Sequence, residues 1–184
     1  MDICEKLFDS RPESGISETE EKVYDFLDGI GATYAGVRHN ATATIEECHN
    51  IERITGAPTY KNIFLCNRTA TDFYLLIMPG DKPFKTKLLS SQLGVSRLSF
   101  ASAENAEKFL NTLPGSLSVL SLLFDTEKKV RLLIDNDINQ LGFVGFHPCN
   151  NTTTLRFSVK ELLDKIIPAL GHEPTFVDLT LPEE

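Results

Sequence analysis

The sequence has no long apolar run, no signal-like start and no cysteine pattern. Its longest purely apolar run is six residues, Phe73 to Met78, whereas a membrane-spanning helix needs about eighteen. The first residues carry mixed charge with no apolar stretch behind them, so no secretory signal is expected. The four cysteines are scattered without a C-x-x-C pair and are expected to be reduced thiols. We therefore expect a cytoplasmic protein that does not enter a membrane.

The sequence also lacks the common catalytic signatures. It contains no glycine-rich phosphate loop, no H-E-x-x-H, no G-x-S-x-G and no dinucleotide fingerprint. His147 and Cys149 can share a metal in principle, but no second pair of ligands lies near them in the sequence, so the zinc signal is weak. An enzyme with this sequence is expected to work without a metal, a cofactor or a recognisable triad.

What is present describes one ordinary globular domain over residues 1–184. Hydrophobic residues make up 41% of the 184 residues and charged residues 24%, and no repeat or low-complexity segment occurs. A chain of this length can bury roughly 70% of its surface, which is enough for a proper core.

Helix and strand patterns alternate along the chain. Three pairs, Ser17 with Glu20, Thr44 with Glu47 and Ser158 with Glu161, have the spacing of capping boxes and predict helix starts. Further helices are predicted from about Lys87 to Leu93 and after Ser102, and Pro168 is expected to bend the last helix. Strands are predicted at 33–38, 62–67, 73–78, 97–100, 130–134, 142–146, 152–157 and 175–179. The segments 62–67 and 73–78 should form a hairpin, and the pattern as a whole predicts a mixed α/β domain.

Charge is distributed unevenly along the sequence. The chain has 18 basic and 26 acidic residues, a net charge of −8, yet the segment Arg53 to Arg97 carries +5 and the rest −13. Such an asymmetry suggests that one face of the protein binds a polyanion, while the acidic remainder of the surface repels it. The alternative is a chance run on a solvated surface.

Two loops and one lysine are candidates for chemistry. The segment from Pro114 to Val119 offers a run of backbone N–H groups beside a glycine, which can hold an oxyanion, or it is a plain helix-to-strand turn. His147 lies in a loop between two predicted strands and can be an acid, a base or a donor, or a structural histidine. The other histidines are interpreted as surface or packing residues. Lys61 enters an apolar strand, where a lysine normally extends its ammonium to water.

Five segments resemble the YbaK/ProX family of aminoacyl-tRNA deacylases, in the family's order and spacing. They are Lys61-Asn62-Ile63-Phe64-Leu65, Leu98-Ser99-Phe100-Ala101, Pro114-Gly115-Ser116, Phe146-His147-Pro148 with Asn151, and Gly171-His172-Glu173-Pro174. The resemblance covers about residues 20–180. The chain is most similar to the PrdX-like branch, stand-alone relatives of the editing domain of prolyl-tRNA synthetase.

The resemblance implies a mixed, largely antiparallel sheet that is partly rolled up and surrounded by helices. It also implies metal-independent hydrolysis of a mischarged tRNA, typically alanine on proline tRNA, with prolyl-tRNA synthetase as a possible partner. Lys61, Gly115 and His147 match the family's catalytic positions, and Ser116, Val119 and Asn151 match substrate-binding ones. The basic segment would take the acceptor stem through Lys82, Lys85 and Lys87.

Val119 departs from the family pattern, because many members have proline there. Proline would fix φ and remove an N–H, whereas valine keeps the donor, so the substrate that the pocket selects is left open. Two other functions remain as alternatives: a tRNA-binding module without hydrolysis, and a binder of a small amino-acid-like ligand with the same fold.

Overall fold

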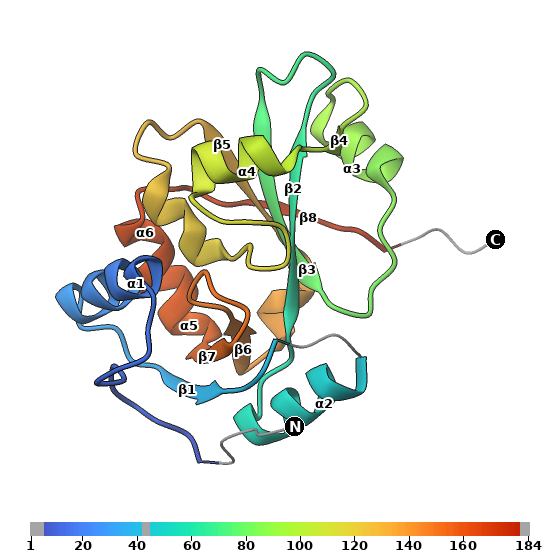
Figure 1. Cartoon of the computed structure of the whole chain (residues 1–184). Coiled ribbons are helices and arrows are strands. Elements are labelled where there is room, and N and C mark those ends of the chain that lie inside the picture. The colour runs from blue at the N-terminus through green and yellow to red at the C-terminus, as the bar shows by residue number, and fades with distance from the viewer. Residues whose placement is uncertain (1–5, 42–44, 181–184) are drawn as a thin grey trace.

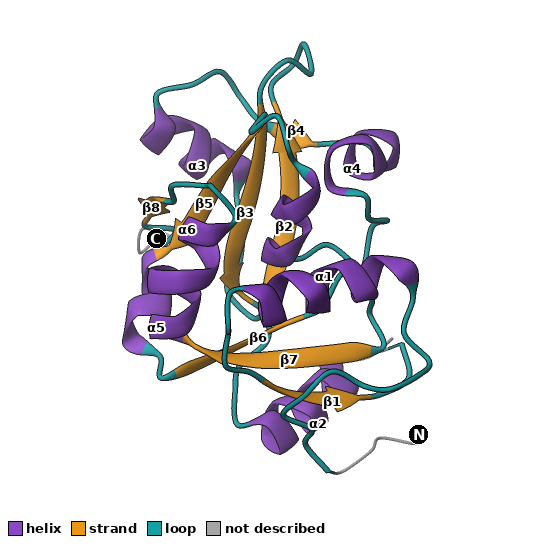
Figure 2. Cartoon of the chain, turned by 90° about the vertical axis from the view of Figure 1, so that its left-hand side faces the viewer, coloured by secondary structure: helices purple, strands orange, loops and turns teal. Residues whose placement is uncertain are grey.

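The computed structural model describes residues 6–41 and 45–180, which form two β-sheets whose strands run across one another (Figure 1, Figure 2). The larger sheet has the order β4-β2-β3-β5-β8 and the smaller one β1-β7-β6. The strands are β1 (Ala35–Arg38), β2 (Tyr60–Cys66), β3 (Phe73–Pro79), β4 (Ser99–Phe100), β5 (Val130–Asp135), β6 (Phe143–Phe146), β7 (Thr153–Ser158) and β8 (Thr175–Val177). The mixed, partly rolled fold predicted above is confirmed.

The helices cover both faces of the larger sheet. They are α1 (Glu18–Gly29), α2 (Ile45–Thr55), α3 (Thr86–Leu93), α4 (Ala103–Leu110), 3-10 helices at Val119–Phe124 and Asn136–Gln140, and a C-terminal helix made of α5 (Val159–Glu161), a π-turn (Leu162–Ile166) and α6 (Ile167–Ala169). Figure 2 shows α3 on one side of this sheet and α1 and α4 on the other. No helix of the described residues is long and apolar enough to cross a membrane.

Helix starts follow the predicted caps. The Oγ of Ser17 accepts a hydrogen bond from the Glu20 N–H at 3.2 Å, and the Glu20 carboxylate accepts one from the Ser17 N–H at 2.9 Å, which completes a capping box. Ser102 caps α4 by a single bond, in which its Oγ accepts from the N–H of Asn105. The second predicted box depends on Thr44, which lies outside the described residues. At the end of α3, Gly94 takes φ +64°, as expected of a helix-terminating glycine.

The hairpin at the centre of the larger sheet is confirmed. Strands β2 and β3 pair antiparallel from Tyr60 opposite Pro79 to Cys66 opposite Phe73. Strand β3 then pairs parallel with β5, so it lies inside the sheet and its residues are buried on both faces. This explains why its sequence is continuously apolar rather than alternating.

Each face of the larger sheet has its own core. On one face, alternate residues of β2, β3 and β5 join α1, α4, the C-terminal helix and the smaller sheet in the larger core. On the other face, the remaining residues of these strands pack against α3 in the smaller core, which includes Leu65, Tyr74, Leu76 and Leu89. Lys61 and Leu65 are four residues apart in β2, so their side chains point to the same face of the sheet, the face that α3 covers.

The two sheets join just before β2. The Gly145 N–H of β6 donates to the Pro58 carbonyl at 3.0 Å, and Thr59 forms an isolated bridge with Gly145. A Cβ at Gly145 would lie 3.2 Å from the Thr154 side chain, so glycine permits this close approach. The junction brings the start of β2 beside the end of β6, and therefore Lys61 near the loop of His147.

Two segments differ from the sequence-based expectation. The apolar stretch after Gly115 forms a 3-10 helix, Val119–Phe124, so the interpretation as a plain helix-to-strand turn is wrong. In the last helix, the Ile167 N–H donates to the carbonyl of Leu162, five residues back, which makes the π-turn just before Pro168. Proline lacks an N–H and its ring crowds the carbonyl four residues earlier, so the predicted bend takes the form of this widened turn.

The third predicted capping box is only half formed. The Ser158 Oγ accepts a hydrogen bond from the Glu161 N–H at 3.0 Å, as predicted. The Glu161 carboxylate instead accepts from the Thr33 N–H at 3.0 Å and from Lys165 at 2.9 Å. It thereby ties the C-terminal helix to the segment leading into β1.

Candidate active site

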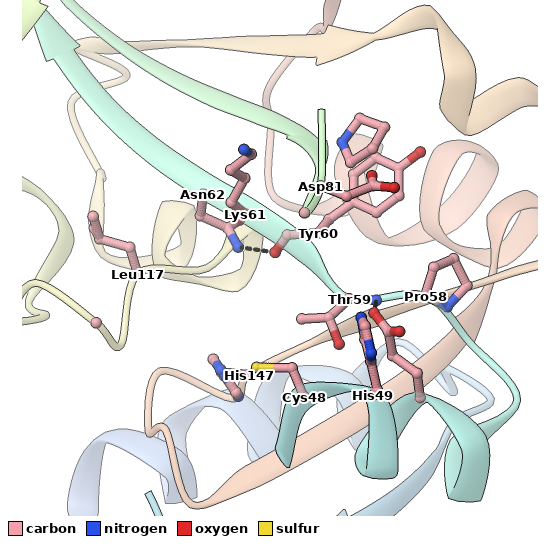
Figure 3. A pocket seen from close by; sticks show the side chains of 14 residues that line it. Cys48, His49, Pro58, Thr59, Tyr60, Lys61, Asn62, Asp81, Leu117 and His147 are labelled. Carbon is pink, nitrogen blue, oxygen red and sulfur yellow. Dashed lines mark hydrogen bonds between the residues drawn. The ribbon is translucent and has the colours of Figure 1, made fainter. Parts of the chain in front are cut away.

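A cavity of about 530 Å³ opens at the junction of the two sheets (Figure 3). Its walls come from α2, the start of β2, the end of β3, the loop after α4 and the loop between β6 and β7. The residues that line it are Cys48, His49, Glu52, Pro58, Thr59, Tyr60, Lys61, Asn62, Pro79, Gly80, Asp81, Gly115, Leu117 and His147. The three residues predicted to be catalytic, Lys61, Gly115 and His147, are therefore brought together although they are far apart in the sequence.

Lys61 lines the cavity, and a hydrogen bond fixes the position of its ammonium group. Its Nζ donates to the carbonyl oxygen of Lys82 at 2.6 Å, and no described carboxylate lies within 4.0 Å of it. An ammonium group has three N–H donors, so two remain for a ligand. Strand β4 pairs only with the far end of β2, at Leu65 and Cys66, and so leaves the edge of β2 at Lys61 open to the cavity.

Lys82 has a different role from the predicted contact with tRNA. Its side chain is only 13% exposed, and its Nζ lies 2.9 Å from the carboxylate of the fully buried Asp135 and 2.8 Å from that of Asp137. Burial alone lowers the pKa of Lys82, but the hydrogen bonds to Asp137 and Asp135 raise it above its usual value. The ammonium is therefore held inside the protein, while the carbonyl of the same residue holds Lys61.

The loop after α4 lines the cavity with two residues whose backbone N–H groups have no acceptor among the described residues. Gly115 has φ +92°, which other residues rarely adopt, and the Ser116 N–H donates to the Leu113 carbonyl at 3.0 Å. Among the described residues, no acceptor is found for the N–H groups of Gly115 and Leu117, both of which line the cavity. Two such donors can bind a carbonyl oxygen and the oxyanion that forms from it.

Ser116 and Val119, two of the predicted substrate-binding residues, do not line the cavity. The Val119 side chain is fully buried in the larger core, at the first position of the 3-10 helix. Ser118 and Ser121 cap that helix, through Leu120 N–H to Ser118 Oγ at 3.2 Å and Ser118 N–H to Ser121 Oγ at 3.1 Å. Residue 119 can therefore influence the cavity only through the backbone of the loop.

His147 is held as a neutral acceptor. Its Nδ1 lies 2.7 Å from the Thr153 carbonyl oxygen, which can only accept, so Nδ1 carries the proton and Nε2 has a free lone pair. Burial lowers the pKa of His147, the hydrogen bond to Thr153 opposes this, and nearby His39 adds to the lowering. At neutral pH the ring is therefore uncharged and offers Nε2 to a proton donor.

A buried carboxylate fixes the loop that carries His147. Glu20 is 1% exposed, and besides capping α1 it accepts hydrogen bonds from Asn150 Nδ2 at 2.8 Å and Thr153 Oγ1 at 3.3 Å. Asn151, the asparagine predicted to bind substrate, does not line the cavity, and its neighbour Asn150 is the one that anchors the loop. The Ser17–Glu20 capping box was visible in the sequence, but its bond to this loop was not.

Several residues of the cavity were not predicted. Asn62 donates to the Tyr60 carbonyl at 3.1 Å, and its Oδ1 is buried without a partner among the described residues. Asp81, Cys48 and His49 add a carboxylate, a thiol and an imidazole to the walls. For Asn62 and Asp81, the available signal was proximity to Lys61 and to the end of a buried strand.

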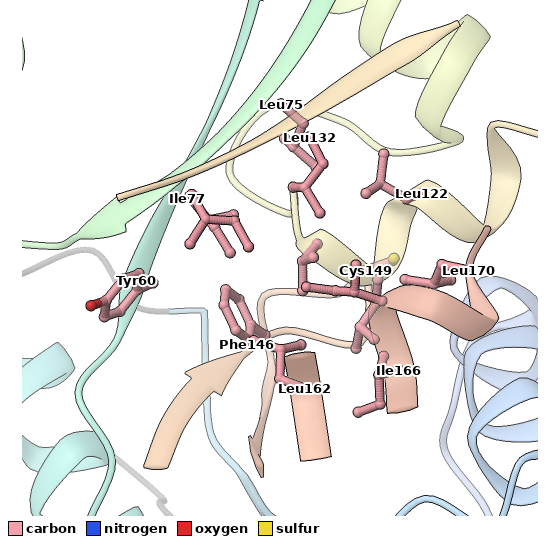
Figure 4. Packing of buried hydrophobic residues seen from close by; sticks show 14 of the residues in the cluster. Tyr60, Leu75, Ile77, Leu122, Leu132, Phe146, Cys149, Leu162, Ile166 and Leu170 are labelled. Atoms are coloured by element: carbon pink, nitrogen blue, oxygen red, sulfur yellow. The ribbon is translucent and has the colours of Figure 1, made fainter. Parts of the chain in front are cut away.

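The weak zinc signal at His147 and Cys149 finds no support in the geometry. Cys149 packs among Leu122, Ile166 and Leu170 in the larger core, with Sγ 3.3 Å from Ser121 Oγ (Figure 4). Burial raises the pKa of Cys149 to about 12, so it remains a thiol, whereas a metal needs the thiolate. Within residues 6–41 and 45–180, no group of three or more histidine, cysteine, aspartate or glutamate side chains could hold a metal.

Replacing Gly115 by alanine tests the loop. At φ +92° an alanine is strained although no atom lies within 4 Å of its Cβ, so the loop should shift and misdirect its N–H groups. Loss of one oxyanion donor typically lowers kcat about 10²- to 10³-fold, so we expect at least a tenfold loss in deacylation. Gly142→Ala is the matched control, because that glycine has open space and no positive φ. Equal rates for Gly115→Ala and Gly142→Ala would exclude the loop from the reaction.

Comparison with known proteins places the chain in a family. Residues 39–165 match the aminoacyl-tRNA editing domain, so the chain belongs to the family of aminoacyl-tRNA editing domains, the class of hydrolases that cleave the ester of aminoacyl-tRNA. The membership predicted from the five segments is confirmed.

Similar proteins extend over nearly the whole chain. The chain is 28% identical over 162 residues to the prolyl-tRNA editing protein ProX of Acetoanaerobium sticklandii, covering 88% of this chain and 98% of that protein. It is 28% identical over 167 residues to prolyl-tRNA synthetase associated domain-containing protein 1 of Mus musculus, covering 88% and 97%. The crystal structure of a candidate trans-editing enzyme for prolyl-tRNA synthetase superposes with a TM-score of 0.67 at 16% identity, covering 91% of this chain and all of the other. That likeness confirms the fold.

Proposed function

We propose that this protein is a trans-acting deacylase that hydrolyses the ester of a small amino acid mischarged on tRNA, with alanine on proline tRNA as its first substrate. The observation that carries the proposal is one cavity lined by Lys61, Gly115, Leu117 and a neutral His147. The N–H groups of Gly115 and Leu117 have no acceptor within the part of the chain that the structure describes. The names of the similar proteins, which refer to prolyl-tRNA editing, support the choice of tRNA.

The groups in the cavity fit ester hydrolysis. The N–H groups of Gly115 and Leu117 would donate to the ester carbonyl oxygen and stabilise the negative charge that develops there. Lys61, with two free N–H donors, would hold the phosphate or ribose of the terminal nucleotide. A water would attack the carbonyl carbon, either directly or after the acyl group has moved to the neighbouring ribose hydroxyl. The bond from that carbon to the ribose oxygen would break, and the ribose oxygen would take up a proton from the attacking water. The products are the free amino acid and tRNA with an intact 3′ end.

His147 would act in this scheme as a hydrogen-bond acceptor. Its Nε2 is free and the ring is neutral, so it can accept from the attacking hydroxyl group or from the α-ammonium of the amino acid. The fixed ring, held through Thr153 and Glu20, would also set the size of the space for the side chain. A small space admits alanine and excludes larger residues sterically, as in the second sieve of an editing enzyme.

The macromolecular partner would be the aminoacylated tRNA. Lys85 and Lys87, exposed at the start of α3, are the predicted contacts whose ammonium groups have no carboxylate partner among the described residues. Lys82 would act inside the protein instead. A complex with prolyl-tRNA synthetase is a further possibility that the names of the relatives suggest.

A panel of aminoacylated proline tRNAs tests the function. We expect hydrolysis of alanyl-tRNA and seryl-tRNA, and no hydrolysis of prolyl-tRNA, in the presence of a chelator. An apolar pocket does not strongly reject a substrate that adds one hydroxyl, at a cost of about 100-fold, so serine should also be removed, but more slowly than alanine. Binding without turnover of any ester would favour the tRNA-binding module. Binding of free amino acids alone would favour the small-ligand binder.

A further inference from the structure

A second groove lies at the other end of β2, away from the cavity. It has a volume of about 470 Å³ and is lined by Arg68, Thr86, Arg97, Leu98, Ser99 and Phe100. These residues come from the β2–β3 turn, the first turn of α3 and the strand β4. The groove therefore combines cationic side chains with an aromatic ring.

The charge of this groove is positive and uncompensated. Arg68 and Arg97 are exposed, and no described carboxylate lies within 4.0 Å of either. Lys85 and Lys87 flank Thr86 at the start of α3, whose first turn holds no acidic residue. Cations at the amino end of a helix oppose the helix dipole, so this arrangement favours an external anion. On a protein with a net charge of −8, two arginines that line the groove and two lysines beside Thr86, all without a carboxylate partner among the described residues, point to a polyanion.

Phe100 gives the groove a stacking surface. Its side chain is 67% exposed, and its ring contacts Phe84 edge-on at a centroid distance of 6.4 Å. Exposed aromatic rings between cations are typical of sites where single-stranded nucleic acid stacks its bases. The ring is held from one side and open on the other.

The groove lies on the same face of the sheet as Lys61. Phe100 pairs directly with Leu65, and Leu65 is four residues after Lys61 in β2, so all three side chains point to one face. Four residues of strand span about 13 Å. At about 3.4 Å per nucleotide along a stacked strand, this distance corresponds to about four nucleotides.

We propose that this groove binds the RNA strand that leads to the aminoacylated 3′ end, with a base stacked on Phe100 and phosphates on Arg68 and Arg97. The inference rests on the proposed function, because it takes the terminal nucleotide to lie at Lys61. The unpaired 3′ end of tRNA has the length needed to reach from the cavity to the groove. In this arrangement the cavity selects the amino acid, and the groove contributes most of the binding energy for the RNA.

Binding of uncharged tRNA tests the groove independently of catalysis. Phe100→Ala is expected to raise Kd about tenfold, since stacking on an aromatic ring is worth about this much per base. Phe176→Ala, another exposed phenylalanine, is the matched control and should bind as the wild type does. Arg97→Glu should weaken binding and lower the slope of log Kd against log salt by about one, whereas Lys160→Glu, an exposed cation on α5, should change neither.

A short substrate separates this proposal from the function. The alanyl ester of adenosine monophosphate is too short to reach the groove, so Phe100→Ala should hydrolyse it at the wild-type rate and hydrolyse alanyl-tRNA more slowly at low concentration. If the wild type hydrolyses neither ester while Phe100→Ala still weakens tRNA binding, the proposed deacylase function is wrong and the proposed RNA-binding groove is supported. If Phe100→Ala and Arg97→Glu bind tRNA no worse than their controls, the groove is not an RNA site.

Discussion

Replacing Lys61 by alanine or by methionine is expected to lower kcat/KM for alanyl-tRNA about a hundredfold while the melting temperature stays near that of the wild type. A hydrogen bond to a charged group is worth about 1.5–3 kcal/mol, which corresponds to about 10- to 150-fold in rate. The part of β2 that holds Lys61 is not covered by β4, and among the described residues the one side-chain bond of Lys61 is to the Lys82 carbonyl, so little of the fold depends on it.

The two Lys61 variants distinguish charge from packing. Methionine keeps the unbranched apolar stem and loses only the ammonium, so both variants should be equally slow if the charge is what matters. Lys160→Ala, at an exposed lysine of α5, is the control for loss of a surface charge. A wild-type rate for Lys61→Met, with a normal melting curve, would show that Lys61 has no role in the reaction and only extends its ammonium to water at the start of a strand.

Replacing Lys82 by methionine is expected to destabilise the protein by about 3–5 kcal/mol, the usual cost of removing one partner of a buried ion pair. Asp135 is fully buried, and without Lys82 its carboxylate would have no counter-ion among the described residues. Urea unfolding, with the midpoint and slope compared to wild type, measures the loss. Deacylation should fall as well, because the carbonyl of residue 82 orients Lys61.

A second substitution at Asp135 gives this prediction its control. Asp135→Asn removes the buried charge, so the double variant Lys82→Met with Asp135→Asn should be more stable than Lys82→Met alone. The same double variant should remain slow if the ion pair is what positions the segment. A Lys82→Met protein that unfolds at the wild-type urea midpoint would show that Lys82 is a surface residue available to tRNA, as the sequence suggested.

Local patterns predicted most of the elements because their causes are local. The Ser17–Glu20 box, the caps at Ser102 and Gly94, and the continuously apolar β3 all depend on residues within a few positions of each other. The hairpin of β2 and β3 followed from a polar turn between two apolar runs. Segments with strong local signals therefore appear in the structure where the sequence placed them.

Which residues form the site could not be predicted fully from the sequence, because it depends on contacts between residues that are far apart along the chain. Lys82 looked like a surface cation because its partners, Asp135 and Asp137, are far along the chain. The family resemblance predicted Val119 as a pocket residue, at the position where many members have proline. In the structure, Val119 starts the 3-10 helix and is buried in the core, and Leu117 lines the cavity. The family resemblance pointed to Lys61, Gly115 and His147, and all three line the cavity, where strand β2 and two loops meet. Their catalytic role stays a prediction.

The most direct test of the account is the crystal structure of the protein with a non-hydrolysable analogue, 3′-deoxy-3′-alanylamino-adenosine, bound. We expect the analogue to bind in the cavity at the junction of the two sheets. Its carbonyl oxygen should lie within hydrogen-bond distance of the Gly115 or Leu117 N–H, its ribose should lie near Lys61, and its alanyl group should lie beside His147. An analogue bound outside the cavity, or bound within it with the carbonyl turned away from the loop after α4, would contradict the central claim.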